Sequence, residues 1–340
     1  MKNGLKVVIV GATGAVGEAM REILEQRSFP VNELVLLASE RSEGKRLQFN
    51  GTSVKVQRLD GYDFSGCDIA LFSAGGAISA EFAPLAEESG CYVVDNTSHF
   101  RYMEDIPLVV PEINGDLIGR NADRKIIANP NCSTIQMVVA LKPIYDAVGI
   151  TRINVCTYQA VSGAGASGIG ELASQTADLL NGKSPTAKVM PKQIAFNAIP
   201  HIDPFQANGY TKEEMKLVWE TKKIFGDESI QINPTCVRIP VFYGHSEAVH
   251  VETTSKISAE KARELLVLGS GIKVIDDPGL DMYPTAVDDG AGQDEVFVGR
   301  IREDISCAKG INLWIVSDNV RKGAALNSVQ IAEKLVEVLV

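Results

Sequence analysis

The sequence predicts an α/β protein of two domains, the first with alternating strands and helices and the second with a mixed sheet in an α+β arrangement. Three observations support this prediction. The 340 residues are more than one compact core usually holds. An apolar strand at 5–10 runs directly into the glycine-rich segment GATGAVG, and a helical pattern follows it. Beyond residue 150, strand patterns are dense, which favours a mixed or largely antiparallel sheet.

The elements of the first domain follow from their apolar patterns. LKVVIV at 5–10 is a continuous β-branched run, typical of a strand buried on both faces of a parallel sheet. The helix after the glycines carries Met20, Ile23 and Leu24 on one side. The second strand, ELVLLAS, follows this helix. The order strand, glycine loop, helix and strand predicts a Rossmann-like dinucleotide-binding domain. Further strands are expected at 54–56, 69–73, 92–94 and 126–128, with a helix over 79–88.

The second domain is predicted to start near residue 131 and to end near residue 320. Its expected helices are 132–147, 168–181, 211–225 and 258–268, and its expected strands are 151–161, 235–241, 247–255, 296–304 and 312–316. The stretch 181–210 is rich in Pro, Asn and Gly, so we expect a long excursion that is functional or covers a partner subunit. An amphipathic helix from about 321 is expected to return to the first domain, which then comprises 1–130 and 321–340.

Composition excludes several classes of protein. The formal net charge of −10 leaves no basic excess for nucleic acid. No apolar run approaches the ~20 residues that span a bilayer, and the run before Gly11 is too short for a signal peptide. The six cysteines show no CxxC spacing, which argues against a zinc site and a disulfide framework. We therefore expect a cytoplasmic protein that binds neither membrane nor nucleic acid.

The glycine-rich loop predicts a nucleotide site. Gly11, Gly14 and Gly17 allow a tight turn and let the backbone approach a pyrophosphate at a helix N-terminus. After the second strand, Glu40 would suit the ribose hydroxyls of NAD, whereas Arg41 would suit the 2′-phosphate of NADP. The neighbouring serines and Lys45 favour NADP. The predicted cofactor residues here are Gly11, Thr13, Gly14, Ala15, Val16, Gly17, Ser39, Arg41 and Ser42.

The segment NPNCSTIQ at 129–136 predicts a nucleophile. Pro130 prevents a helix from entering on its N-terminal side, and the apolar pattern that follows starts one, so Cys132 lies at a helix N-terminus. Unpaired N–H groups and the helix dipole stabilise a thiolate there. A thiolate can add to an aldehyde carbonyl, and the adduct can lose hydride to a nicotinamide and leave a thioester.

A base or acid is needed beside this cysteine, and the chain has four histidines. His250 alternates within a predicted strand and is compatible with a structural role. His245 follows Gly244 where a strand gives way to a bend, and it is a slight favourite from residue types alone. His99 and His201 have less informative surroundings.

Six motifs in order resemble the aspartate-semialdehyde dehydrogenase family. They are GATGAVG at 11–17, NPNCSTIQ at 129–136, YQAVSGAG at 158–165, TKEEMK at 211–216, RIPVFYGH at 238–245 and VGRIRED at 298–304. Together they extend over almost the whole chain. The resemblance implies NADP-dependent reductive dephosphorylation of L-aspartyl 4-phosphate to L-aspartate 4-semialdehyde, in amino-acid biosynthesis toward lysine, threonine and methionine. It also implies a homodimer.

The resemblance also implies roles for individual residues. Cys132 would be the nucleophile and His245 the general acid/base, with Gln159 orienting the covalent adduct. Arg238 would bind the substrate carboxylate through its planar guanidinium fork, and Glu213 would bind the substrate amine. Arg101 and Lys216 would bind the phosphate, with Asn131 beside the nucleophile. The residues at the nicotinamide would be Ser162, Gly163 and Asn319.

Three alternatives remain open from the sequence. An N-acetyl-glutamyl-phosphate reductase shares the cysteine, the histidine and NADP, but it needs no acid for a free α-amine, so TKEEMK argues against it. A reductase of acyl-CoA thioesters would replace the phosphate-binding pair with a pocket for a bulky thiol. A non-catalytic NADP-binding paralogue would tolerate loss of Cys132, His245 or Arg238, and all three are present.

Overall fold

The computed structural model describes residues 4–120 and 124–339. Its chain forms two compact units, each with its own sheet. The first comprises the described residues of 1–131 and 324–340, and the second comprises 132–323. The predicted α/β class is confirmed, because each unit is a mixed sheet with helices packed on it.

The first unit is built on a seven-stranded sheet of order β3-β4-β2-β1-β5-β6-β7. All its pairings are parallel except that of β3 with β4. The strands are β1 (Leu5–Val10), β2 (Val31–Ala38), β3 (Arg46–Phe49), β4 (Thr52–Arg58), β5 (Ile69–Phe72), β6 (Tyr92–Asp95) and β7 (Ile126–Ala128). Because β1 lies between β2 and β5, the chain reverses direction along the sheet there, where doubly wound folds form a ligand crevice.

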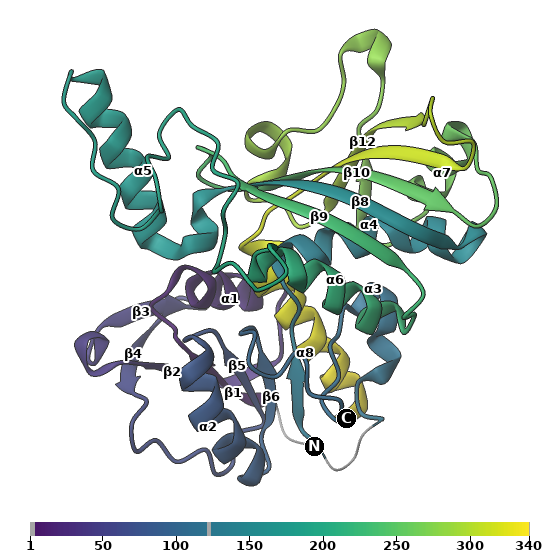
Figure 1. Ribbon diagram of the computed structural model, residues 1–340. Helices are drawn as coiled ribbons and strands as arrows, with labels where there is room; N and C mark the ends of the chain where they lie inside the picture. Colours follow the sequence, from purple (N-terminus) through teal and green to yellow (C-terminus); the bar gives the residue numbers. More distant parts are fainter. Residues whose placement is uncertain (1–3, 121–123, 340) are drawn as a thin grey trace. The chain divides into compact units, whose positions relative to one another are not determined.

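Four helices accompany this sheet: α1 (Ala15–Gln26), α2 (Gly76–Glu88), the single turn α3 (Pro111–Asn114) and α8 (Leu326–Leu339). The apolar side of α1 packs with α8 over β1, in a core that includes Ile9, Met20, Ile23 and Val329. The C-terminal helix therefore belongs to the first unit, although the whole of the second unit lies before it in sequence. Figure 1 shows α8 in yellow beside the purple and blue elements of this unit.

The strand β3 was not predicted. It forms a hairpin with β4 through Asn50 and Gly51, whose φ angles are +46° and +72°. This left-handed pair is the two-residue turn that Asn-Gly favours, so the sequence did contain the signal. β3 has only four residues and is partly exposed, and its apolar alternation is correspondingly weak.

The second unit is built on a six-stranded mixed sheet of order β11-β12-β13-β10-β8-β9. Its strands are β8 (Ile150–Gln159), β9 (Gln231–Arg238), β10 (His245–Thr253), β11 (Ile272–Val274), β12 (Val296–Glu303) and β13 (Gly310–Ser317). The helices α4 (Cys132–Val148), α6 (Lys212–Phe225) and α7 (Ala259–Val267) cover one face, called the inner face below (Figure 1). The strand predicted at 235–241 instead spans 231–238, since Pro240 cannot donate to a ladder.

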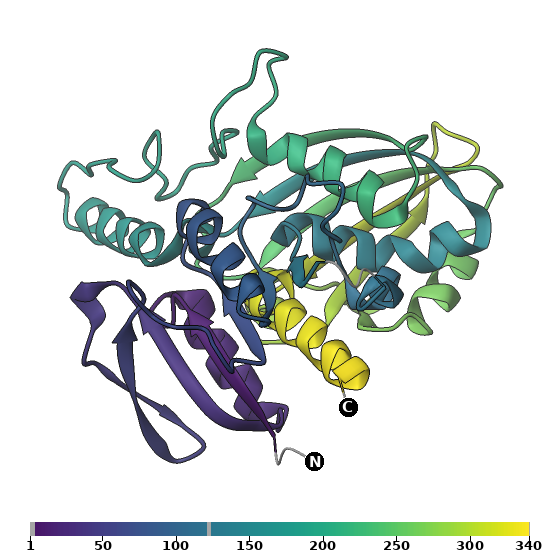
Figure 2. The same ribbon diagram turned by 90° about the horizontal axis from the view of Figure 1, so that it is seen from below.

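The excursion predicted at 181–210 contains no helix or strand longer than an isolated bridge. Its residues nevertheless pack against α5 (Gly165–Leu180), in a cluster that includes Leu172, Met190 and Ile194. Glu171 accepts three backbone N–H groups from 188–190, and Gln175 Oε1 accepts two from 194–195. Two polar side chains of one helix thus replace the missing secondary structure, which a composition-based prediction cannot detect. Figure 2 shows the backbone of this segment running beside the teal helix α5.

Within residues 4–120 and 124–339, no helix is both long enough and apolar enough to cross a bilayer. The same residues contain no cluster of three or more His, Cys, Asp or Glu side chains arranged to hold a metal ion.

Candidate active site

Cys132 is the first residue of α4, as the proline before the apolar pattern predicted. Its side chain is partly exposed, whereas all of the next nine residues of the helix are buried. The N-terminus of α4 therefore presents a partly exposed thiol at the start of a buried segment, and the dipole of a 17-residue helix favours its thiolate. A Cβ at Gly323 would lie 2.7 Å from Cys132 Cβ, so only glycine permits this approach.

Strand register aligns four side chains on the inner face of the second sheet. Gln159 of β8 is opposite Arg238 of β9, and β10 places His245 next to β8 on the other side, opposite Ser317 of β13. These four residues, called the first row below, are all less than 7% exposed. Three of the four were predicted site residues, and pairing brings them together although they are up to 86 residues apart.

His245 is fully buried and has a fixed orientation. The Ala160 N–H donates to His245 Nδ1 at 3.0 Å. Burial, with the charge of Arg238 as the next cause, lowers the pKa of His245 to about 3, so the ring is neutral at pH 7. Because Nδ1 accepts, the ring's single proton lies on Nε2, which is 3.4 Å from Gln159 Nε2. The row therefore presents an N–H donor at His245 Nε2.

Gln159 joins this row to α6. Its Oε1 accepts from Thr157 Oγ1 at 3.0 Å, and its Nε2 donates to Glu213 Oε1 at 3.1 Å. Lys216 Nζ donates to Glu213 Oε2 at 2.8 Å and to Asp203 Oδ2 at 2.7 Å. Burial opposes the charge of Lys216, but the two carboxylates outweigh it and raise its pKa, so the ammonium stays charged.

Arg238 has an almost free guanidinium. Its Nη1 donates to the Ala160 carbonyl at 2.7 Å, and within the described part of the chain this is the one hydrogen bond of the guanidinium. Burial lowers the pKa of Arg238, opposed by the charges of Glu213 and Cys132, and a guanidinium remains protonated at any physiological pH. A buried fork with several unused donors is suited to a carboxylate.

The loop that follows β8 is held against the turn before β10. Ser162 and Asn319 hydrogen-bond through their side chains at 2.9 and 3.2 Å, and the Gly244 N–H donates to Asn319 Oδ1 at 3.0 Å. A Cβ at Gly163 would lie 2.9 Å from Arg238 Nη1 and 3.6 Å from His245 Nε2. Gly163 therefore keeps open the space in front of the first row.

The glycine loop of the first unit has the form that a pyrophosphate needs. Gly11 has a φ of +88°, and α1 starts at Ala15 with Gly14 as its uncapped N-cap. A Cβ at Gly17 would lie 2.3 Å from the Gly11 carbonyl oxygen, so only glycine lets the helix pack so closely on the turn. Thr13 and Gly14 are exposed, which leaves first-turn N–H groups open to an anion. These features fit a dinucleotide.

The side chains after β2 are the groups that would distinguish NADP from NAD. Ser39, Glu40 and Arg41 are exposed, and Ser42 is buried and accepts from Thr13 Oγ1 at 3.2 Å. Glu40 Oε1 lies 3.4 Å from Arg58, so its carboxylate already has a cation. Arg41 is therefore the exposed group available for a phosphate.

Two predicted substrate residues lie in the first unit, whereas the others lie in the second. Arg101 is 6% exposed and its Nη2 donates to the Asn96 carbonyl at 3.0 Å. Asn131 is 6% exposed and immediately precedes α4. The predicted phosphate pair, Arg101 and Lys216, is thus divided between the units.

Comparisons with known proteins agree along the whole chain. Residues 6–120 match the family described as "Semialdehyde dehydrogenase, NAD binding domain", and residues 141–322 match "Semialdehyde dehydrogenase, dimerisation domain". The aspartate-semialdehyde dehydrogenase 2 of Vibrio cholerae is 63% identical over 336 residues, which is 99% of both chains. The chain belongs to the aspartate-semialdehyde dehydrogenase family. The predicted family and its oxidoreductase activity are confirmed.

Solved structures of aspartate-semialdehyde dehydrogenases also match the fold. The Vibrio cholerae enzyme II complexed with ASA has 62% identity and a TM-score of 0.96, with 98% of each chain covered. The Candida albicans enzyme with NADP has 25% identity and a TM-score of 0.75, with 99% of this chain and 100% of that chain covered.

The sequence did not identify every polar residue of this aspartate-semialdehyde dehydrogenase site. Asp203 pairs with Lys216 from within the irregular 181–210 segment, and no local pattern marks it. Ala160 supplies both a backbone N–H to His245 and a carbonyl to Arg238. The YQAVSGAG motif does contain this alanine, but a backbone contact leaves no residue-type signal.

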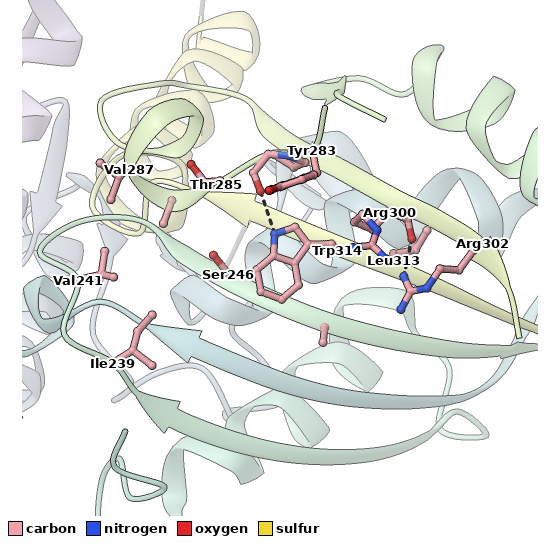
Figure 3. Close-up of a pocket in the computed structure, with 13 residues that line it drawn as sticks. Ile239, Val241, Ser246, Tyr283, Thr285, Val287, Arg300, Arg302, Leu313 and Trp314 are labelled. Carbon is pink, nitrogen blue, oxygen red and sulfur yellow. Dashed lines mark hydrogen bonds between the residues drawn. The ribbon is translucent and has the colours of Figure 1, made fainter. Parts of the chain in front are cut away.

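The opposite, outer face of the second sheet is open and hollowed. A cavity of about 580 Å³ lies over β10 and β13 and under the 283–287 segment. Figure 3 shows Trp314 donating to the Pro284 carbonyl at its edge, with Arg300 and Arg302 at one end. Ser246 and Trp314 alternate with residues of the inner face, so this cavity is separate from the first row.

Proposed function

We propose that this chain catalyses the NADP-dependent reductive dephosphorylation of L-aspartyl 4-phosphate to L-aspartate 4-semialdehyde through a thioester on Cys132. The observation that carries the proposal is the first row. It combines a buried guanidinium, an amide and an imidazole N–H in one register, in the unit whose first helix starts at the nucleophile. An α-amino acid with a reacting acyl group matches that combination of donors with the carboxylate of Glu213.

Substrate binding follows from the charges of the site. The Arg238 fork would bind the α-carboxylate, because its remaining donors are free for two parallel hydrogen bonds. Glu213 would accept from the α-ammonium, because a carboxylate is an acceptor for an ammonium and this one already accepts from Gln159 and from the ammonium of Lys216. Lys216 and Arg101 would bind the phosphate, with Asn131 beside the nucleophile Cys132. In the absence of phosphate, Asp203 and Glu213 neutralise Lys216.

The chemistry starts at the thiolate of Cys132, which the N-terminus of α4 stabilises. Its sulfur attacks the acyl carbon, the C–O bond to phosphate breaks, and a thioester forms while phosphate leaves. NADPH, when bound, supplies the hydride that reduces the thioester carbon. His245 Nε2–H donates to the tetrahedral oxygen, and Gln159 holds that adduct in place. The C–S bond then breaks, which releases the aldehyde and restores the thiolate.

The nucleotide would bind the first unit, and NADP is preferred to NAD. Gly11, Thr13, Gly14, Ala15, Val16 and Gly17 would receive the pyrophosphate, and Ser39, Arg41 and Ser42 the 2′-phosphate. Ser162, Gly163 and Asn319 would line the nicotinamide side, where Gly163 leaves room. On this proposal, 1–130 with 321–340 bind NADP, and 131–320 bind substrate, carry out catalysis and dimerise.

The chain would act as a cytoplasmic homodimer. The second unit matches a dimerisation domain, and the outer face of its sheet is uncovered within the described residues. A second copy would cover the cavity that Tyr283 and Trp314 help to line, whose apolar lining is otherwise exposed to solvent. Small molecules would be its other partners, with no nucleic acid or membrane.

The test is phosphate-dependent oxidation of L-aspartate 4-semialdehyde with NADP, followed by NADPH absorbance. N-acetyl-glutamate semialdehyde runs in parallel, and NAD replaces NADP in a second series. We expect turnover with the first substrate alone, dependent on phosphate, and a lower kcat/KM with NAD. A Lys216→Ala variant should raise the KM for phosphate, whereas Lys212→Ala, an exposed lysine of the same helix, should not. Preference for the acetylated substrate would remove the amine-binding role of Glu213 and contradict the proposal.

A further inference from the structure

A second polar row lies directly beneath the first on the inner face. Two residues further into the sheet, register aligns Cys236 of β9, Thr157 of β8, Glu247 of β10 and Ile315 of β13. The rows touch, because Thr157 Oγ1 donates to Gln159 Oε1 of the first row at 3.0 Å. Cys236, Thr157, Glu247 and Ile315 are all 0% exposed.

Glu247 is the unexplained member of this second row. Neither oxygen of its carboxyl completes a hydrogen bond with another described residue, although the residue has no access to solvent. A buried carboxylate without a cation is unfavourable, and burial raises the pKa of Glu247 well above its ordinary value. Burial therefore favours the protonated carboxyl, which can donate a hydrogen bond. A buried carboxyl without a hydrogen bond is rare in folded proteins, so its presence requires an explanation.

The partner is on α4. Gln136 is one helical turn beyond Cys132, on the same side of the helix, and is 1% exposed. Both atoms of its side-chain amide also lack a completed hydrogen bond among the described residues. Its amide is the group that acts on the carboxyl of Glu247, lowering the pKa against the effect of burial. A hydrogen bond between the acid and the amide would satisfy both side chains.

The two partners belong to the two elements that carry the chemistry. Gln136 is four residues after Cys132 on α4, and Glu247 is two residues after His245 on β10. We propose that Glu247 and Gln136 form a buried pair that fixes α4 against β10 and so positions Cys132 relative to His245. Glu247 is on this view a positioning residue that contacts neither substrate nor cofactor. The inference rests on the proposed roles of Cys132 and His245.

An ion pair and simple packing both account for Glu247 less well. An ion pair would need a cation at the carboxyl, but neither oxygen of Glu247 has a hydrogen-bonding partner among the described residues. Simple packing would be served better by an apolar residue, as Ile315 serves it in the same row. A polar acid facing a polar amide, one layer behind the reacting groups, indicates a directional contact.

Four variants of the full-length enzyme distinguish a directional hydrogen bond at Glu247 from simple packing. Glu247→Leu and Gln136→Leu each remove the pair and keep the volume close, and Glu247→Gln keeps a neutral hydrogen-bonding group. Val249→Ala is the matched control, since Val249 is the next inner-face residue of β10 and is 2% exposed. Phosphate-dependent kcat and KM with aspartate semialdehyde are measured, with melting temperature and the rate of Cys132 alkylation by iodoacetamide.

We expect both leucine variants to lose kcat by about 10- to 100-fold, as a misplacement of about 1 Å at a reacting group does, while KM changes less than threefold. Glu247→Gln should retain kcat within about threefold. The double variant Glu247→Leu/Gln136→Leu should lose no more than one single variant, because both remove the same contact. Val249→Ala should melt earlier and keep its kcat.

Equal kcat in wild type and both leucine variants would overturn the inference, and so would additive losses in the double variant. A loss in Glu247→Gln as large as in Glu247→Leu would equally overturn it. Where Glu247→Leu does not fold, Gln136→Leu tests the same contact from α4. Absence of turnover in the wild-type enzyme would refute the proposed function instead, which keeps the two failures distinct.

Discussion

Replacement of Arg238 by lysine keeps a positive charge in the first row but removes the planar fork. In the structure Arg238 Nη1 is held by the Ala160 carbonyl, and the other guanidinium donors make no hydrogen bond within the described residues. Lysine has one terminal nitrogen, so it can bind the substrate carboxylate or the Ala160 carbonyl but cannot reproduce the parallel pair of bonds. The variant should therefore bind substrate less well without loss of the fold.

The magnitude follows from the bonds that are lost. A hydrogen bond to a charged group contributes ~1.5–3 kcal/mol, and each ~1.4 kcal/mol changes an equilibrium tenfold. Loss of one arm of the fork should therefore reduce kcat/KM for aspartate semialdehyde by about 10- to 150-fold. Because the α-carboxylate is held equally in the ground and transition states, most of the loss should appear in KM.

The assay is the phosphate-dependent reaction over a range of aspartate semialdehyde concentrations. Arg263→Lys is the matched control, because Arg263 is bound to Asp276 through two hydrogen bonds away from the first row. An Arg238→Lys variant with kcat/KM within twofold of wild type would refute the reasoning. A loss confined to kcat would assign Arg238 to the reacting groups and contradict its binding role.

Three further predictions test other parts of the site. Gly163→Ala should lower kcat/KM at least tenfold, because its Cβ would lie 2.9 Å from Arg238 Nη1; Gly170→Ala, a helical glycine with open space, should stabilise the fold by ~0.5–1 kcal/mol without effect on turnover. Equal activity of the two variants would contradict this. The Cys132→Ala variant should still bind NADP, as measured by fluorescence titration, but should show no turnover. Residual activity above a trace would refute the thioester mechanism. The unfolded state ionises Glu247 near its ordinary pKa of 4.5 while the folded state keeps its proton, so this group's contribution to stability falls as pH rises above 4.5 by ~1.4 kcal/mol per unit until its raised folded pKa is reached. Glu247→Gln should gain stability over wild type with rising pH in urea unfolding, and a constant difference from pH 5 to 8 would contradict it.

The sequence by itself determined the glycine loop and the start of α4, because both depend only on residues that are adjacent in sequence. Gly11, Gly14 and Gly17 predict a turn and an open helix N-terminus because their spacing is local. Pro130 followed by an apolar pattern predicts that α4 starts at Cys132 for the same reason. Six motifs in order predicted the family, which the comparisons confirm.

The features of the site that depend on strand register and on burial were decided by the tertiary structure alone. Arg238, Gln159 and His245 become one row only through the pairing of three strands, and that pairing depends on the whole sheet. Asp203 reaches Lys216 from a segment without secondary structure. Glu247 belongs to HSEAVHVE, where local alternation gives no sign that α4 encloses its carboxyl. A charge in a strand is usually solvated, and only the helix packed against this face excludes water from it and turns an ordinary glutamate into a buried acid.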